Sequence, residues 1–110
     1  MDFAEYQTKA RRTQNPELTQ HERLLHALLG MCSEVGEVQA IYQKAYQGHE
    51  VKTEKVIDEC GDVLWFAAEL CDVLGVNMEG VAQYNIDKLQ KRYPDRFSAE
   101  RSVNRREYRV

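Results

Sequence analysis

Two pairs of acidic residues in the middle of the chain have a spacing that suits metal chemistry. Glu34 and Glu37 are three residues apart in one apolar stretch, and Glu59 and Asp62 are three residues apart in a second. On a helix this spacing places both side chains of a pair on one face, one turn apart. Charged side chains are seldom buried unless they are paired or hold a metal. Four carboxylates in half-buried surroundings therefore indicate a site for a divalent cation.

The types of these ligands favour a hard cation. All four are carboxylates, and ligation by oxygen alone favours Mg²⁺, with Mn²⁺ as a substitute, over zinc. A di-iron bundle would need a Glu-x-x-His motif, but His26 follows Glu22 by four residues. We therefore interpret His21, His26 and His49 as structural or solvent-facing. Because Mg²⁺ keeps open positions for water and phosphate oxygens, the carboxylates favour phosphate chemistry.

Positive groups that could bind phosphate follow later in the chain. Asn85, Lys88 and Arg92 are spaced by three and four residues, so they share one face of a helix. An ordinary amphipathic helix would also expose such a face. Asn85 argues against that reading, because it lies beside an apolar stripe where an apolar residue would be expected.

The elements that must position these residues are helices. Apolar residues recur at helical spacing, and no alternating strand pattern, repeat or linker is present. Short connections favour antiparallel neighbours. The sequence therefore predicts an all-α fold, with helices over about residues 2–13, 20–47, 54–74 and 78–92.

Local signals mark the ends of these helices. Thr19 and Glu22 form a capping-box pattern at the start of the second helix. Gly48 and Gly75 are natural helix stops. The other signals are Thr53 and Asn77 as expected caps of the third and fourth helices, Pro94 as the end of the fourth, and a polar tail after Phe97 that contains Arg101, Arg105, Arg106 and Arg109.

Three glycines, Gly30, Gly36 and Gly61, lie inside predicted helices, and the last two each lie between the two acids of a pair. Gly36 separates Glu34 from Glu37, and Gly61 separates Glu59 from Asp62. Glycine inside a helix costs about 1 kcal/mol relative to alanine. All three glycines could simply be tolerated at the surface. We favour close approach of the two helices there, which would bring the acidic faces together.

Composition bounds the class of protein. The 110 residues predict one domain, 43% of them hydrophobic and 30% charged, and the net charge of -3 gives no global basic field suited to nucleic acid. No apolar run approaches the roughly 20 residues that span a bilayer, and the N-terminus lacks the features of a secretory signal. Cys32, Cys60 and Cys71 are expected to be buried free thiols, and a reducing cytoplasm fits them.

The three segments, in this order, resemble the MazG-like all-α nucleoside triphosphate pyrophosphohydrolases. The resemblance rests on Glu34-x-x-Glu37, on Glu59-x-x-Asp62 within residues 58–65, and on the Asn/Lys/Arg-Tyr-Pro segment over residues 85–94. It covers about residues 20–98, the core of a single domain over 1–110, and leaves out the first helix and the arginine-rich tail 99–110. It implies a four-to-five-helix bundle completed by homo-oligomerisation, as a homodimer or homotetramer.

The resemblance also implies roles for the residues above. Glu34, Glu37, Glu59 and Asp62 would bind Mg²⁺, and a (d)NTP would be cleaved between its α and β phosphates to a nucleoside monophosphate and pyrophosphate. Either Glu37 or Glu34 would be the general base. The expected substrate contacts are Lys88 and Arg92 with the leaving pyrophosphate, Asn85 with phosphate or sugar, Lys44 and Lys55 with phosphate, and Trp65 or Phe66 with the base. For both lysines we favour simple exposure to solvent over a phosphate contact, and for both aromatic residues core packing over a contact with the base.

Two other functions remain open. A non-catalytic helical module could keep the fold for oligomerisation or regulation, although a decayed site would be expected to lose an acid and all four are present. The C-terminal arginines could bind nucleic acid, although Glu100 and Glu107 interrupt them. The apolar circumference of the helix predicted over 54–74 favours cover on more than one side, and hence a homo-oligomer.

Overall fold

The computed structural model describes residues 1–105, and within them every regular element is a helix. This confirms the all-α class. The chain forms two compact units, residues 1–78 and the residues from 79 onward. Arg106 and Arg109 of the predicted tail lie outside the described residues. The helices are α1 (Phe3–Arg11), α2 (Gln20–Ala45), α3 (Thr53–Leu74), α4 (Met78–Arg92) and α5 (Ala99–Val103).

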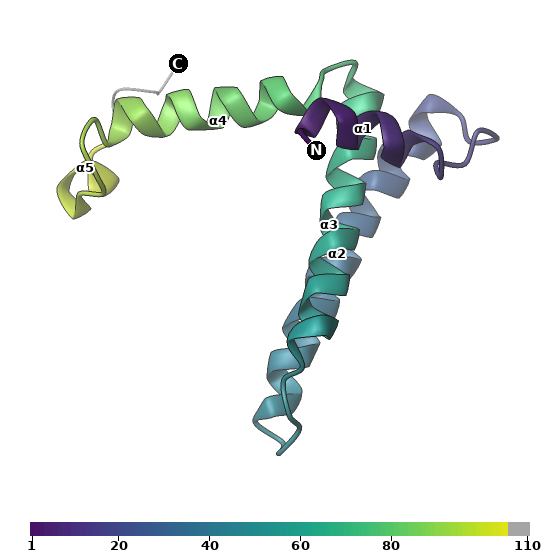
Figure 1. Cartoon of the computed structure of the whole chain (residues 1–110), viewed down its shortest axis with the longest axis horizontal. Coiled ribbons are helices and arrows are strands. Elements are labelled where there is room, and N and C mark those ends of the chain that lie inside the picture. Colours follow the sequence, from purple (N-terminus) through teal and green to yellow (C-terminus); the bar gives the residue numbers. More distant parts are fainter. Residues whose placement is uncertain (106–110) are drawn as a thin grey trace. The chain divides into compact units, whose positions relative to one another are not determined.

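The first unit is built on a long hairpin in which α2 and α3 lie side by side (Figure 1). The predicted capping box starts α2: the Glu22 N–H donates to Thr19 Oγ1 over 3.1 Å, and the Thr19 N–H donates to Glu22 Oε1 over 2.9 Å. Gly75 ends α3 with a left-handed φ of 70°. The prediction for Thr53 was wrong, because Thr53 is already helical and Lys52 takes the cap position without a side-chain hydrogen bond.

The close approach of α2 and α3 occurs at Gly30. A Cβ atom on Gly30 would overlap the ring of Phe66, so the absence of a side chain lets this ring pack against the backbone of α2. Added Cβ atoms on Gly36 and Gly61 would meet no atom within 4 Å. Of the three glycines expected to allow close approach, Gly30 therefore does so, whereas Gly36 and Gly61 mark no contact within the chain.

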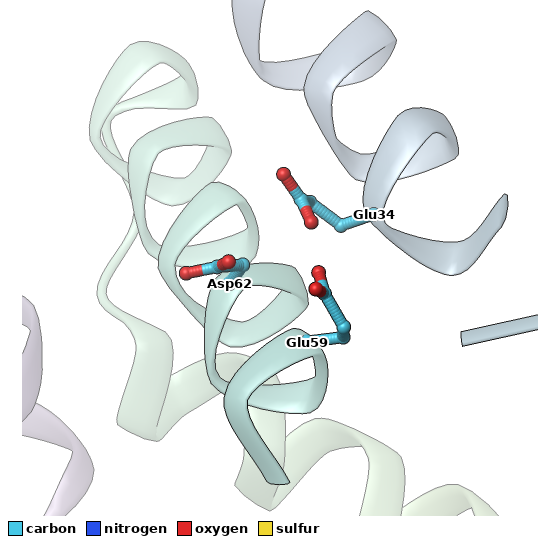
Figure 2. A group of neighbouring side chains, drawn as sticks. All are labelled: Glu34, Glu59 and Asp62. Atoms are coloured by element: carbon cyan, nitrogen blue, oxygen red, sulfur yellow. The ribbon is translucent and has the colours of Figure 1, made fainter. Parts of the chain in front are cut away.

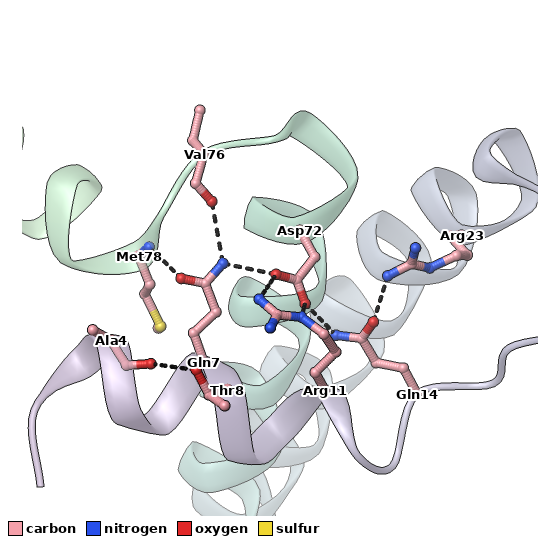
Figure 3. A network of polar contacts seen from close by, with 9 residues as sticks. All are labelled: Ala4, Gln7, Thr8, Arg11, Gln14, Arg23, Asp72, Val76 and Met78. Carbon is pink, nitrogen blue, oxygen red and sulfur yellow. Dashed lines mark hydrogen bonds and ion pairs between the residues drawn. The ribbon is translucent and has the colours of Figure 1, made fainter.

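The first helix is fixed to the end of α3 by buried polar groups (Figure 3). The Gln7 amide donates to Asp72 Oδ1 over 2.8 Å and to the Val76 carbonyl over 3.1 Å, and its oxygen accepts the Met78 N–H over 2.7 Å. Arg11 donates to both carboxylate oxygens of Asp72. These bonds satisfy the buried Gln7 side chain and fix α1 to the end of α3 and to residues 76–78 that follow it.

The apolar core of the first unit is small. It consists of Ala10, Ala68, Cys71 and Met78, with Tyr6, Leu64, Trp65 and Ala67 packed against it. Ala27 is the only buried residue that α2 contributes. Several large apolar side chains of the hairpin are at least 43% exposed: Leu25, Leu28, Leu29, Val35, Tyr42, Ile57 and Leu74. The hairpin thus leaves much of its apolar surface uncovered within one chain.

The three cysteines differ from the prediction in their burial. All three are free thiols, as expected, but only Cys71 is buried, and Cys32 and Cys60 are exposed. Burial, together with the charge of Asp72, raises the pKa of the Cys71 thiol. Cys32 and Cys60 belong to apolar stripes that a single chain does not cover.

The second unit contains nearly all of α4 and a short helix that the sequence did not predict. As expected, α4 begins directly after Asn77 and ends before Pro94. α5 lies in the polar tail, and its start is capped by Ser98, whose Oγ accepts the Arg101 N–H over 3.4 Å. No helix among residues 1–105 has the length and apolar character needed to cross a bilayer.

Candidate metal centre

Three of the four predicted acids converge between the two long helices (Figure 2). Glu34 reaches across from α2 to Glu59 and Asp62 on α3, and one carboxylate oxygen from each lies within 4.8 Å of the others. Glu59 is buried, Glu34 is half-buried and Asp62 is exposed. The spacing of three on α3 therefore does what the sequence predicted and presents two carboxylates to the neighbouring helix.

The carboxylates of this group repel one another. Hydrogen bonding to Glu59 raises the pKa of Glu34 to about 7, helped by burial and by the charges of Asp62, Glu59 and Glu37. None of the three clustered acids forms an ion pair with a lysine, arginine or histidine in the part of the chain described. The group consequently holds a proton where a divalent cation would relieve its repulsion. Oxygen ligands alone suit Mg²⁺, Mn²⁺ or Ca²⁺.

Glu37 lies outside the cluster of three, although its charge contributes to the raised pKa of Glu34. It is exposed and lines a cavity of about 220 Å³ at the loop end of the hairpin. Lys44, Lys52 and Lys55 line the same cavity. Two predicted phosphate contacts, Lys44 and Lys55, are thus brought to one cavity beside a carboxylate.

The predicted contacts on α4 belong to the second unit. Asn85 is exposed, and Lys88 and Arg92 are half-buried. The Arg92 guanidinium lies 5.6 Å from the centre of the Tyr93 ring, a cation–π distance. Their roles toward a substrate stay predictions.

Trp65 and Phe66 both pack within the first unit. The Trp65 indole N–H donates to Thr13 Oγ1 over 2.9 Å, and its ring meets the Phe66 ring edge-on with centroids 5.1 Å apart. Half-buried Trp65 lies against the core and half-buried Phe66 against Gly30. Packing accounts for both rings, and a contact of Trp65 with a base stays a prediction.

Sequence reasoning missed one acid. Glu69 of α3 is fully buried, and its Oε1 lies 2.7 Å from His26 Nδ1 on α2. The available signal was its position: Glu69 lies seven residues after Asp62 and directly beside the apolar residues Ala68 and Leu70. His26 lies outside the acidic cluster.

A larger cavity of about 780 Å³ lies away from the acidic cluster, along α1 and the end of α3. Its carboxylate, Asp72, already accepts hydrogen bonds from Arg11, Gln7 and Gln14. Burial raises the pKa of Asp72, but these bonds outweigh it and hold the pKa below its ordinary value. A neutralised carboxylate of this kind stabilises the fold and is poorly suited to bind a cation.

Comparison with known proteins agrees with this geometry. Residues 19–97 match the model of the MazG nucleotide pyrophosphohydrolase domain. The chain is 34% identical to the Gene 37 protein of Mycobacterium phage L5 over 76 residues, which are 64% of this chain and 67% of that protein. No solved structure matches the chain. The matched region contains all four predicted acids and the whole α2–α3 hairpin, and we conclude that this chain belongs to the MazG nucleotide pyrophosphohydrolase family.

Proposed function

We propose that the protein is a Mg²⁺-dependent hydrolase that cleaves (d)NTP between the α and β phosphates, giving (d)NMP and pyrophosphate. The observation that carries the proposal is the convergence of Glu34, Glu59 and Asp62 from two helices onto one point. Such a cluster is unstable as three free anions and suits a cation that also binds phosphate.

Each acid has a proposed part in this chemistry. Glu34, Glu59 and Asp62 would hold Mg²⁺, which Mn²⁺ could replace, and the bound ion would neutralise phosphate charge and lower the pKa of a water. Glu37 lies next to this group without belonging to it, so its carboxylate remains available to accept a proton from the attacking water. We therefore favour Glu37 over Glu34 as the general base.

Positive groups would bind the phosphates. Lys44 and Lys55 line the cavity beside Glu37 and would draw the β and γ phosphates toward the loop end of the hairpin. Lys88 and Arg92 would stabilise charge on the leaving pyrophosphate, and Asn85 would donate a hydrogen bond to phosphate or sugar.

We further propose that the active protein is a homodimer or homotetramer. The uncovered apolar side chains of the α2–α3 hairpin support this, because a monomer seldom exposes so wide an apolar surface. A second copy packed on the hairpin would complete a helical bundle and cover Leu29 and Ile57, which are 69% and 65% exposed.

The proposed role is removal of surplus or damaged nucleotides in the cytoplasm, where three free thiols would stay reduced. The test is incubation with a panel of nucleoside triphosphates and Mg²⁺, with pyrophosphate and orthophosphate separated among the products. We expect pyrophosphate and the monophosphate. Release of orthophosphate with a diphosphate product would place the cleavage at the wrong bond and contradict the proposal.

A further inference from the structure

Glu69 is the one fully buried charged side chain among residues 1–105, and packing does not explain it. Its Oε1 contacts His26 Nδ1, while its Oε2 is buried without a hydrogen-bond partner in the described residues. A buried carboxylate with one partner destabilises a helix pair relative to an apolar side chain of similar size. Its presence indicates that Glu69 serves the residue it contacts.

That residue, His26, is held at Nδ1, and its side chain is partly exposed. The Nδ1 edge of the imidazole faces the buried carboxylate, whereas the side chain as a whole is 45% exposed. The Phe66 ring lies 5.4 Å away, centre to centre, and the Trp65 ring 6.3 Å away and edge-on. A carboxylate bound to Nδ1 sets the orientation of an imidazole and leaves Nε2 for a second partner.

The groups along the α2–α3 interface have an order that gives a substrate a direction. Lysines and Glu37 come first, around the cavity at the loop end, and the acidic cluster follows. Further from the loop lies the contact of Gly30 with Phe66, and beyond that contact lies the pair of His26 and Glu69. With the phosphates drawn toward the lysines and the metal centre at the cluster, the nucleoside would extend toward His26.

We propose that His26 binds the nucleobase of the substrate through Nε2 and that Glu69 is its positioning residue; the inference rests on the proposed function above. His26 precedes Glu34 by eight residues, about 12 Å along a helix, which is too far for His26 to act on the phosphorus at the metal centre. It is the right direction for a base, which Nε2 can meet through a hydrogen bond. His26 would thus set which nucleotides are accepted.

Binding can be measured without turnover. Protein labelled with ¹⁵N-histidine is titrated with deoxynucleoside monophosphates and, separately, with pyrophosphate, all without metal. The ring signals of His26, assigned with His26→Gln, are expected to shift with the monophosphates, by amounts that differ among bases, and to stay in place with pyrophosphate. Exposed His21 serves as the internal control. The proposal would be overturned if the His26 signals do not shift with any monophosphate, or if they shift with pyrophosphate alone.

Kinetics supply the second test. Removing His26 alone would leave Glu69 buried without a partner and endanger folding, so the double variant His26→Ala/Glu69→Leu removes both groups. We expect its KM to rise about tenfold, because the loss of one hydrogen bond of about 1.4 kcal/mol weakens binding by that factor. We also expect kcat within about twofold of the original, since the metal centre is intact. The ratio of kcat/KM between bases should approach one.

The positioning role of Glu69 has its own readout. Glu69→Leu alone should raise KM as much as the double variant, because His26 then loses its fixed orientation. Glu69→Gln should restore most of the loss, since the amide oxygen can still accept a hydrogen bond from Nδ1. Unchanged KM and base preference in the double variant would refute the proposal. If monophosphates shift the His26 signals but the protein releases no pyrophosphate, the nucleobase site is supported and the proposed reaction is refuted.

Discussion

Glu34 of α2 faces Glu59 of α3 across the helical hairpin, and hydrogen bonding to Glu59 raises the pKa of Glu34 to about 7. The two residues are 25 positions apart in the sequence. Only the packing of α2 on α3 brings the two carboxylates together, so the acidic cluster forms only when the hairpin is folded.

Metal binding should depend on pH near neutrality. Below about pH 7 Glu34 keeps its proton, and a divalent cation must displace it. We expect Mn²⁺ affinity, measured by calorimetry, to fall as the pH drops from 8 to 6, with proton release that grows over the same range. Glu34→Gln should remove this pH dependence along with most of the affinity. An affinity that is constant from pH 6 to 8 would contradict the raised pKa of Glu34.

The raised pKa of Glu34 should also make the stability of the metal-free protein depend on pH, in the direction opposite to metal affinity. A carboxyl whose pKa is raised on folding binds its proton more tightly in the folded state, so its contribution to stability is lost as the pH rises through the folded pKa. We expect the free energy of unfolding to decrease between about pH 4.5 and pH 7 in the presence of a chelator. Glu34→Gln should flatten this decrease, as should saturating Mn²⁺.

The polar contacts of α1 should matter for stability. Gln7→Ala leaves the Met78 N–H, the Val76 carbonyl and Asp72 without the buried Gln7 amide. We expect a loss of about 1–3 kcal/mol in the free energy of unfolding, measured in urea. Lys9→Ala is the matched control on the same helix, because its ion pair with Glu5 is exposed and should contribute less than about 1 kcal/mol. Equal losses in the two variants would contradict the anchoring of α1 by Gln7.

The helix contact at Gly30 can be tested with two alanines. Gly30→Ala places a methyl group into the Phe66 ring and should destabilise the fold by about 1–3 kcal/mol. Gly36→Ala meets no atom within 4 Å and should stabilise α2 by up to about 1 kcal/mol through helix propensity. Urea unfolding of both variants decides between them. Similar changes in both would mean that the two helices pack in another register.

Oligomerisation should depend on the uncovered face of the hairpin. Leu29→Glu puts a charge on a position that is 69% exposed in one chain, and it should shift the protein toward monomers in sedimentation velocity. Tyr46→Glu is the control, because Tyr46 is 95% exposed beyond the end of α2 and should leave the assembly unchanged. A monomeric original protein would contradict the proposal directly.

The helices could be predicted because their signals are local. Caps, breaks and helical spacing lie within a few residues of each other, and the capping box of Thr19 and Glu22 forms as expected. The short α5 was missed because its apolar content is low and its start rests on Ser98 alone. The burial of the cysteines was missed because an apolar stripe says nothing about which chain covers it.

The site could be predicted only as far as the spacing of its acids allows. Glu59 and Asp62 share a face of α3, and both join the cluster. On α2 the register of the hairpin selects Glu34, whereas Glu37 turns toward the lysine cavity. Register depends on the loop and on the contact of Gly30 with Phe66, which spacing along one helix does not reveal. Glu69 was missed for the same reason, since its partner His26 lies 43 residues away.

The most direct test of the metal centre is Mg²⁺-dependent pyrophosphate release by variants that each remove one negative charge from α3. Glu59→Gln and Asp62→Asn should each lower kcat at least about a hundredfold while the far-ultraviolet circular dichroism stays helical, since a bound metal contributes several kcal/mol to such reactions. Asp58→Asn, an exposed acid next to Glu59 but outside the cluster, should retain nearly full activity. Full activity in Glu59→Gln or Asp62→Asn would contradict a metal centre at these residues.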